Sequence, residues 1–301
     1  MSSPSTALRL TGRDVLPLLH RTTSNALADL IPGQARATLF CDFRGRLQHR
    51  AIVAVTPDGA VWLLRDDAPG APLAAVVDRM VFRDDVAIED RSESLAVRLV
   101  ADPAREVRVT TSESGVPSLV ATGDGTALAI GHARPEPALD EAARIALLHP
   151  KHGHEIAEAW NPFEIGLAHE VHLAKGCFTG QEALQRLITY ASVRRRPAHV
   201  RLTQAPDALP AALHANGEAA GQVTSVSGGE AFALLAVDAF ASGATFTLAD
   251  GGTVTIVSAP NPLARSGGRE RAAPFRPRRP AACRPRRAHR WSTRSRRVSR
   301  R

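Results

Sequence analysis

The sequence predicts an α+β protein that ends in a small all-β domain. Short apolar runs bounded by Gly, Pro and Asp turns occupy most of the chain, which is typical of antiparallel strands. Only a few segments have helical spacing, and they do not alternate regularly with strands as in a parallel sheet. With 301 residues, of which 44% are hydrophobic, the chain is long enough to form two or three cores.

The N-terminal part combines helices and strands. Residues 8–27 contain a short apolar run, a Gly-Arg-Asp turn and apolar residues at helical spacing, which predicts a strand, a turn and a helix with Asp14 as N-cap. Apolar runs predict three strands next, and the last two form a hairpin around the turn Pro57-Asp58-Gly59. These three strands lie at 35–40, 51–55 and 61–64. A helix over 71–80 and several short strands over 86–130 follow.

Two helices and a β domain follow. Apolar spacing predicts a helix over 139–148 and a second helix that begins at Gly180 and continues over 181–190. From 198 to 257 the pattern changes to short strands separated by Gly, Asn and Asp turns, which predicts a small barrel. We therefore divide the chain into an α+β region (1–195), a C-terminal β-barrel (196–260) and a tail (261–301).

The tail has a composition of its own. Residues 262–301 contain 15 arginines and one acid, a net charge of +14, so the rest of the chain carries −6 although the total is +8. Arg, Pro, Ala and Ser cannot bury enough apolar surface to offset the entropy of ordering, which predicts disorder. Two origins compete: a basic arm that binds nucleic acid, and an out-of-frame read of GC-rich coding DNA.

Several protein classes do not fit the sequence. No run approaches the roughly 18 apolar residues of a membrane span, and the first residues lack the pattern of a signal peptide, so we expect a cytoplasmic protein without a membrane partner. The three cysteines, Cys41, Cys177 and Cys283, are odd in number and far apart. They predict neither a disulfide framework nor a stable metal site, so any cysteine function is that of a single thiol.

One segment, Lys175 to Glu182, concentrates chemistry. Two glycines allow a tight turn, a cysteine lies between them, a lysine precedes it, and a helix begins directly after. A cation and a helix N-terminus both favour a thiolate, so Cys177 is the candidate catalytic residue. In the alternative interpretation Cys177 packs beneath the turn, Lys175 is solvated, and Glu182 pairs with Arg186.

This segment is similar to the signature KGC(Y/F)xGQE of the YgfZ family, folate-binding relatives of the glycine-cleavage T-protein. The similar positions are Lys175, Gly176, Cys177, Phe178, Gly180, Gln181 and Glu182, with Arg186 where the signature continues with an arginine. Three further stretches resemble the family: 39–47 through Cys41, Asp42, Gly45 and Arg46; 149–167 through Pro162, Glu164, Gly166 and Leu167; and 217–226. The resemblance covers nearly all of residues 8–258, and the tail matches nothing.

The resemblance implies a three-lobed, T-protein-like arrangement with a central hole where tetrahydrofolate or a one-carbon derivative binds. A pterin ring offers paired N–H groups that suit a carboxylate, and a glutamyl tail suits cations. The candidate folate-binding residues are Asp42, Glu155, Glu164, Lys175, Gln181 and Arg195, the last within the run Arg194 to Arg196. Structural alternatives remain, because Asp42 can cap a turn, Glu164 can cap a helix, and the arginine run can be a solvated edge.

The resemblance also implies a function in maintaining iron–sulfur proteins and, through some of them, in tRNA modification. The expected partners are folate and iron–sulfur proteins or their assembly factors. One cysteine cannot hold a cluster alone, since clusters use about four thiolates. A folate-dependent aminomethyltransferase is the alternative, weakened because neither Gln48 nor His49 supplies the carboxylate of the T-protein. A nucleic-acid-binding protein is the second alternative and requires a genuine tail.

Overall fold

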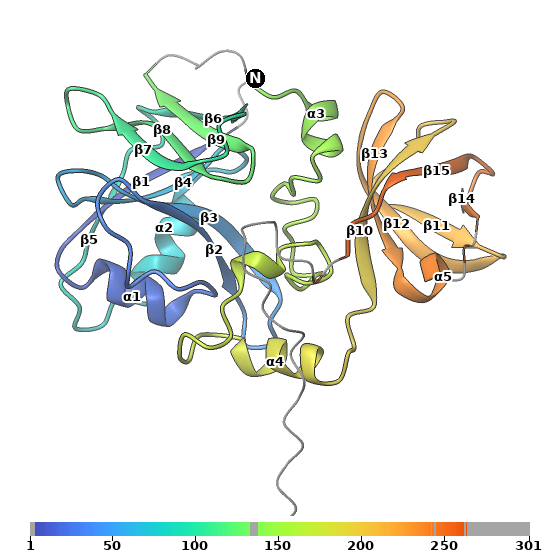
Figure 1. Cartoon of the computed structure of the whole chain (residues 1–301), viewed down its shortest axis with the longest axis horizontal. Helices are drawn as coiled ribbons and strands as arrows, with labels where there is room; N and C mark the ends of the chain where they lie inside the picture. The colour runs from blue at the N-terminus through green and yellow to red at the C-terminus, as the bar shows by residue number, and fades with distance from the viewer. Residues whose placement is uncertain (1–3, 133–137, 242, 244, 262, 264–301) are drawn as a thin grey trace, which may run out of the picture. The chain divides into compact units, whose positions relative to one another are not determined.

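The computed structural model in Figure 1 describes residues 4–132, 138–241, 243, 245–261 and 263. Except for Asn261 and Leu263, the predicted tail lies outside these residues, so its disorder stays a prediction. Within the described part of the chain, none of the helices is long and apolar enough to cross a membrane.

The first sheet has five antiparallel strands in the order β2-β3-β4-β1-β5. These are β1 (Thr6–Thr11), β2 (Ala35–Cys41), β3 (Leu47–Val55), β4 (Val61–Arg65) and β5 (Ala87–Asp90). Helices α1 (Val15–Thr22) and α2 (Gly70–Asp78) cover one face, where Leu18 and Leu73 share a core with Val53 and Leu63. The strands and helices predicted for residues 8–80 are thus confirmed.

A second antiparallel sheet covers the other face of the first. It contains β6 (Ala96–Ala101), β7 (Val107–Thr111), β8 (Pro117–Thr122) and β9 (Thr126–Gly131) in the order β6-β9-β8-β7. Ile52 and Trp62 point into the core between the sheets, while Val53 and Leu63 point toward the helices. Strands β3 and β4 are therefore buried on both faces, which explains their continuous apolar runs.

The segment between the second sheet and the barrel contains short helices: α3 (Glu141–Ala146), the 3₁₀ helix η1 (Ala168–Glu170) and α4 (Gln181–Thr189). Its apolar side chains, including Phe163 and Leu184, form a core with Leu47 of β3 and Phe232 of the barrel. This core connects the first sheet to the barrel, and the segment between residues 147 and 180 packs against both.

The C-terminal domain is a closed six-stranded barrel in the order β10-β13-β12-β11-β14-β15 (Figure 1). Its strands are β10 (Arg195–Leu202), β11 (Ala211–Ala215), β12 (Glu218–Ser227), β13 (Glu230–Ala236), β14 (Phe246–Leu248) and β15 (Thr253–Ser258). The predicted α+β class with a terminal barrel is confirmed. The sequence pattern missed α5 (Val237–Ala241), because its apolar residues continue those of β13 without a break.

Two local predictions need correction. Asp14 is at the N-cap position of α1, but its side chain makes no cap hydrogen bond and instead accepts the N–H of Asp85 at 2.9 Å. Helix α3 is shorter than the predicted 139–148, since Asp140 caps it by accepting the N–H of Ala143 at 2.7 Å and Leu148 has a left-handed backbone with φ of 51°.

Candidate functional site

The motif loop before α4 is fixed to the turn that follows β2. Gly176 and Gly180 both have a left-handed backbone, and Gly180 packs directly on the backbone of Asp42 and Gly45. Gly45 in turn faces the side chain of Leu184 in α4. The two stretches that carry much of the family resemblance are therefore neighbours in space.

Asp42 stabilises this turn. Its Oδ1 atom accepts the N–H groups of Arg44 and Arg46, each at 2.8 Å. Asp42 therefore caps the turn with its Oδ1 atom, as the structural alternative expected. Its predicted role in folate binding stays a prediction.

Lys175 joins the motif loop to α1. Its ammonium donates to the backbone oxygen of His20 and lies 5.0 Å from the ring centroid of Phe178, and burial lowers the pKa of Lys175 to about 8. His20 Nδ1 accepts the N–H groups of Leu27 and Ala28, so its Nε2 carries the proton and donates to the backbone oxygen of Lys175 at 3.2 Å. The alternative of a solvated Lys175 is therefore wrong.

Cys177 is exposed at the tip of this fixed loop. Gln181 closes the loop by donating its amide to the backbone oxygen of Leu173 at 2.8 Å. The packing alternative for Cys177 is wrong, because its side chain does not lie beneath the turn. Its predicted catalytic role stays a prediction, as does a folate-binding role for Gln181.

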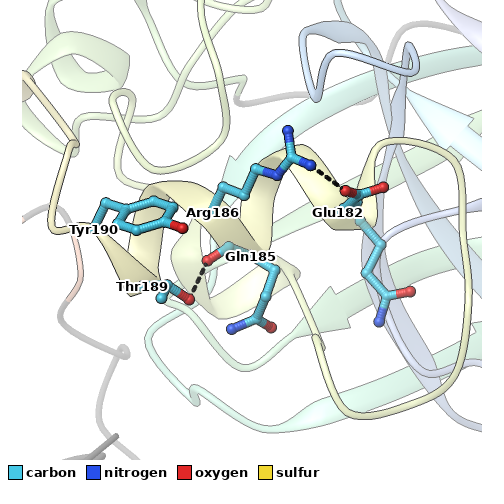
Figure 2. Close-up of a pocket in the computed structure, with 6 residues that line it drawn as sticks. Glu182, Gln185, Arg186, Thr189 and Tyr190 are labelled. Carbon is cyan, nitrogen blue, oxygen red and sulfur yellow. Dashed lines mark hydrogen bonds and ion pairs between the residues drawn. The ribbon is translucent and has the colours of Figure 1, made fainter. Parts of the chain in front are cut away.

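The exposed face of α4 borders a surface pocket of about 420 Å³ (Figure 2). Glu182 and Arg186 form the ion pair expected one turn apart, and Thr189 donates to the backbone oxygen of Gln185 at 2.9 Å. Tyr190 is 75% exposed at the end of the helix. The pocket is a shallow feature beside the motif, built from side chains that bond mainly within the helix.

Glu164 is engaged by neighbouring donors. It accepts the side-chain amide of Asn161 at 2.8 Å and pairs with Arg195 at 3.4 Å and Arg46 at 3.8 Å. The Arg195 guanidinium also lies 5.1 Å from the ring centroid of Trp160. The structure thus brings Glu164 and Arg195 together, next to the turn that Asp42 caps.

Glu155 is fully buried and has four donors. Thr224 and Ser225 of β12 donate to Oε1 at 2.5 and 2.7 Å, while Arg144 and the N–H of Lys151 donate to Oε2 at 3.2 and 3.0 Å. Glu155 therefore fastens the barrel to the segment after α3, and a ligand would have to displace a protein donor to reach it.

A cavity of about 300 Å³ lies where β3 of the first sheet, the β8–β9 turn of the second sheet, the loop after α3, η1 with the residues before it, and the barrel strands β10 and β15 meet. Its walls are largely apolar, and its polar side chains come from six residues: Arg50, Asp124, Thr126, His149, His169 and Asn261. Apolar walls with a few polar groups are typical of small-molecule sites. None of the six was a candidate from the sequence.

Arg50, which lines this cavity, is paired with the buried Glu170. Its guanidinium makes contacts of 2.7 to 3.0 Å with both oxygens of the buried Glu170 and donates to His149 Nε2 at 3.1 Å. Burial opposes ionisation of Glu170, but the charge of Arg50 outweighs it and lowers the pKa of Glu170 to about 2. Burial and Arg50 lower the pKa of His149 to about 3, so its ring is neutral with the proton on Nδ1.

A second cluster of charged residues shares a small pocket with Arg50 and includes Arg65, Asp66 and Asp67. Burial and the neighbouring Asp67 raise the pKa of Asp66 to about 6. Burial and the charge of Arg65 lower the pKa of His49 to about 4, and the ring stacks on His152 with centroids 5.4 Å apart. His49 is therefore a neutral group whose Nδ1 contacts Arg65 at 3.1 Å, not a substitute charge for the T-protein aspartate.

Some of these residues carried a sequence signal. An arginine at the start of the apolar run 51–55 had to be buried with a partner, because an unpaired buried charge is costly. Asp124 lies in a Gly-Asp-Gly turn. Aspartate is common in turns for backbone reasons, so its presence there did not indicate a binding residue.

Comparisons with known proteins agree with this architecture. Residues 194–261 match the family described as "CAF17, C-terminal beta-barrel domain". A 90-residue segment is 33% identical to a putative chloroplastic transferase of Arabidopsis thaliana, covering 30% of this chain and only 21% of that protein. The fold matches the glycine cleavage system aminomethyltransferase T of Bartonella henselae with a TM-score of 0.68 and 16% identity, over 88% of this chain and 85% of the other.

Proposed function

We propose that the chain binds a reduced folate in the cavity around Arg50 and His149, because its barrel matches the CAF17 C-terminal domain family and its fold matches that of an aminomethyltransferase T. The observation that carries the proposal is the cavity itself, whose largely apolar walls and few polar groups suit a flat heterocycle. Asp42, Glu155 and Glu164 remain alternative pterin partners, although each already accepts hydrogen bonds from the protein.

The charges around the cavity favour the ring of the folate over its glutamyl tail. Arg50 is neutralised by Glu170, and His149 is neutral, while Asp124 carries a negative charge. A carboxylate ligand would meet net repulsion, whereas an N–H-rich ring would be attracted. The glutamyl tail would then leave the cavity, and Lys175 and Arg194 to Arg196 are its candidate cations.

We further propose that the chain supports iron–sulfur proteins through Cys177, and through some of them tRNA modification. The exposed thiol lies on a loop held by Lys175 at one side and by Gln181 and Gly180 at the other. A single thiol cannot retain a cluster, so Cys177 would act transiently on an iron–sulfur protein or assembly factor. The cytoplasm remains the expected location.

A one-carbon transferase is the second candidate, and Asp66 favours it. The β3–β4 register, continued two residues beyond the Ile52–Leu64 pair, places Asp66 opposite Arg50. An acid therefore lies directly after the neighbouring strand, although positions 48 and 49 lack one. Transfer of an aminomethyl group to tetrahydrofolate, followed by mass spectrometry, distinguishes this candidate from a binding protein.

The folate proposal is tested by thermal unfolding. At a tetrahydrofolate concentration of about 100 times the dissociation constant, the native state gains roughly 2.7 kcal/mol, a shift of roughly 5–10 °C. Leu147→Trp should fill the cavity from its half-exposed wall and abolish the shift without lowering the melting temperature of the free protein.

Leu209→Trp is the matched control, because Leu209 is also partly exposed but is not among the residues that line the cavity. This variant should keep the full shift. A wild-type melting curve that does not move at millimolar tetrahydrofolate contradicts the proposal.

A further inference from the structure

Asp124 is a carboxylate with a fixed orientation at the cavity wall. It lies between two glycines with left-handed backbones, Gly123 and Gly125, in the turn that joins β8 to β9. Its Oδ1 atom accepts both the N–H and the hydroxyl of Thr126, at 2.9 and 2.8 Å. These two bonds hold the side chain in one position, so its direction does not depend on a ligand.

The second oxygen of Asp124 is available. In the described part of the chain, no other residue donates a hydrogen bond to it or forms an ion pair with it. Arg50 is the arginine of the cavity lining, and its nitrogens already contact Glu170 and His149. The other nearby carboxylates differ from Asp124, because Glu170 and Glu155 are fully engaged by protein donors.

His149 supplies the complementary group. Arg50 can only donate, so His149 Nε2 accepts and Nδ1 carries the hydrogen. In the described chain Nδ1 has no hydrogen-bond partner, and the residue lines the same cavity as Asp124. The cavity thus offers one oriented acceptor and one donor within otherwise apolar walls.

We propose that Asp124 and His149 together recognise a ring edge that presents N–H donors beside a carbonyl oxygen, such as the 2-amino-4-oxopyrimidine edge of a pterin. The open carboxylate oxygen accepts from the ring N3–H, beside the amino group, and the imidazole donates to the ring oxygen. Thr126 is a positioning residue. This inference rests on the proposed folate function, and it names the residues that form hydrogen bonds with the ring.

The test measures binding of tetrahydropterin and of its N3-methyl analogue to the full-length protein by calorimetry. Wild type should bind tetrahydropterin roughly 10–100-fold more tightly than the methylated ring, because methylation removes one charge-assisted hydrogen bond. Asp124→Asn should lose roughly that factor for tetrahydropterin and show little preference between the two rings. Thr126→Val should show a smaller loss with the preference retained.

Asp58→Asn is the matched control, since Asp58 also accepts from a threonine hydroxyl and a backbone N–H in a turn, but is not part of the cavity lining. It should bind both rings as wild type does. Equal binding of tetrahydropterin by wild type and Asp124→Asn overturns this inference alone and leaves folate binding in place. Absence of folate and pterin binding to wild type overturns both proposals.

Discussion

The backbone oxygen of Asp42 lies 2.5 Å from the point where residue 180 would carry a β-carbon, so the motif loop and the turn after β2 fit together only with glycine at 180. This contact places the exposed Cys177 loop against the end of β2 and β3. The glycine of the motif therefore has a physical reason: it combines a left-handed backbone, φ of 84°, with close backbone packing.

Gly180→Ala should lower the free energy of unfolding by roughly 2 kcal/mol or more, since it adds left-handed strain to a backbone clash. Urea unfolding measures the loss, which corresponds to roughly 4 °C or more in melting temperature. Gly176→Ala is the control, because Gly176 is also left-handed but has no atom within 4 Å of the added carbon. Equal losses in the two variants would show that the Asp42 contact contributes nothing.

Cys177 should be the reactive thiol of the folded body. Iodoacetamide should label Cys177 in the native protein and spare Cys41 until unfolding, because Cys41 is buried and burial raises the pKa of its thiol to about 12. Peptide mass mapping assigns each label and separates Cys283, which lies outside the described residues.

The functional counterpart is complementation. Cys177→Ser should melt like wild type, since its side chain is exposed, yet fail to restore iron–sulfur enzyme activity in a strain that lacks the protein. Cys41→Ser should instead be less stable and retain activity in proportion to the amount of folded protein. Full restoration by Cys177→Ser would exclude the proposed role of this thiol.

Mild acid should weaken the fold through two histidines. The pKa values of His149 and His49 are lowered in the folded state to about 3 and about 4, so between about pH 6.5 and 4 the unfolded chain binds more protons. The free energy of unfolding should therefore decrease as the pH is lowered from about 6.5 to 4, by at most about 1.4 kcal/mol per pH unit for each histidine. Above pH 6.5 both states are neutral and this effect vanishes.

Urea unfolding at pH 7 and pH 5 tests this, with His149→Gln as the variant because its side-chain oxygen can still accept from Arg50. The variant should show a smaller loss of stability between the two pH values. Replacing the exposed His132 in the same way should leave the loss unchanged. An identical pH dependence in all three proteins would contradict the assignment.

Glu170→Gln should destabilise the fold by roughly 3–5 kcal/mol, because it leaves the buried Arg50 without a counter-charge. The stability that Glu170 contributes is present above pH 4.5 and is lost as the pH falls toward its folded pKa of about 2. Glu182→Gln breaks an exposed ion pair and should change stability by less than about 1 kcal/mol. Comparable effects of the two substitutions would remove the structural role assigned to the Arg50–Glu170 pair.

Removal of residues 264–301 should leave the melting temperature and folate binding unchanged, since the four apolar cores use residues no later than Ala259. Salt-dependent RNA binding by the full chain, lost on truncation, would support the basic-arm interpretation. The coding DNA offers a direct check of the frameshift interpretation, which expects another frame to continue a sensible protein sequence.

Local patterns predicted most of the fold. Apolar runs with turn signals located β2, β3 and β4, and the change of pattern after residue 198 located the barrel, because these features depend on neighbours within a few residues. Helix α5 was missed for the same reason, since its apolar residues directly continue those of β13.

The candidate site was predicted only in part. Spacing alone singled out the loop of Lys175 and Cys177 and the Glu182–Arg186 pair, since these interactions are local. The resemblance implied a central folate-binding hole, but the residues that line the cavity were not predicted, because Arg50, Asp124 and His149 come from separate strands and loops.

What the sequence by itself determined is the order of the elements, the barrel and the glycine-bounded thiol loop, because backbone preference and apolar period act over short distances. Only the tertiary structure decided which charged side chains are paired within the protein and which can accept a ligand. Arg50 meets a partner 120 residues away in Glu170, and Glu155 meets donors in the barrel, whereas Asp124 keeps one oxygen without a partner among the described residues. The physical reason is that a buried charge requires partners, and the fold alone determines which residues come within hydrogen-bonding distance of it.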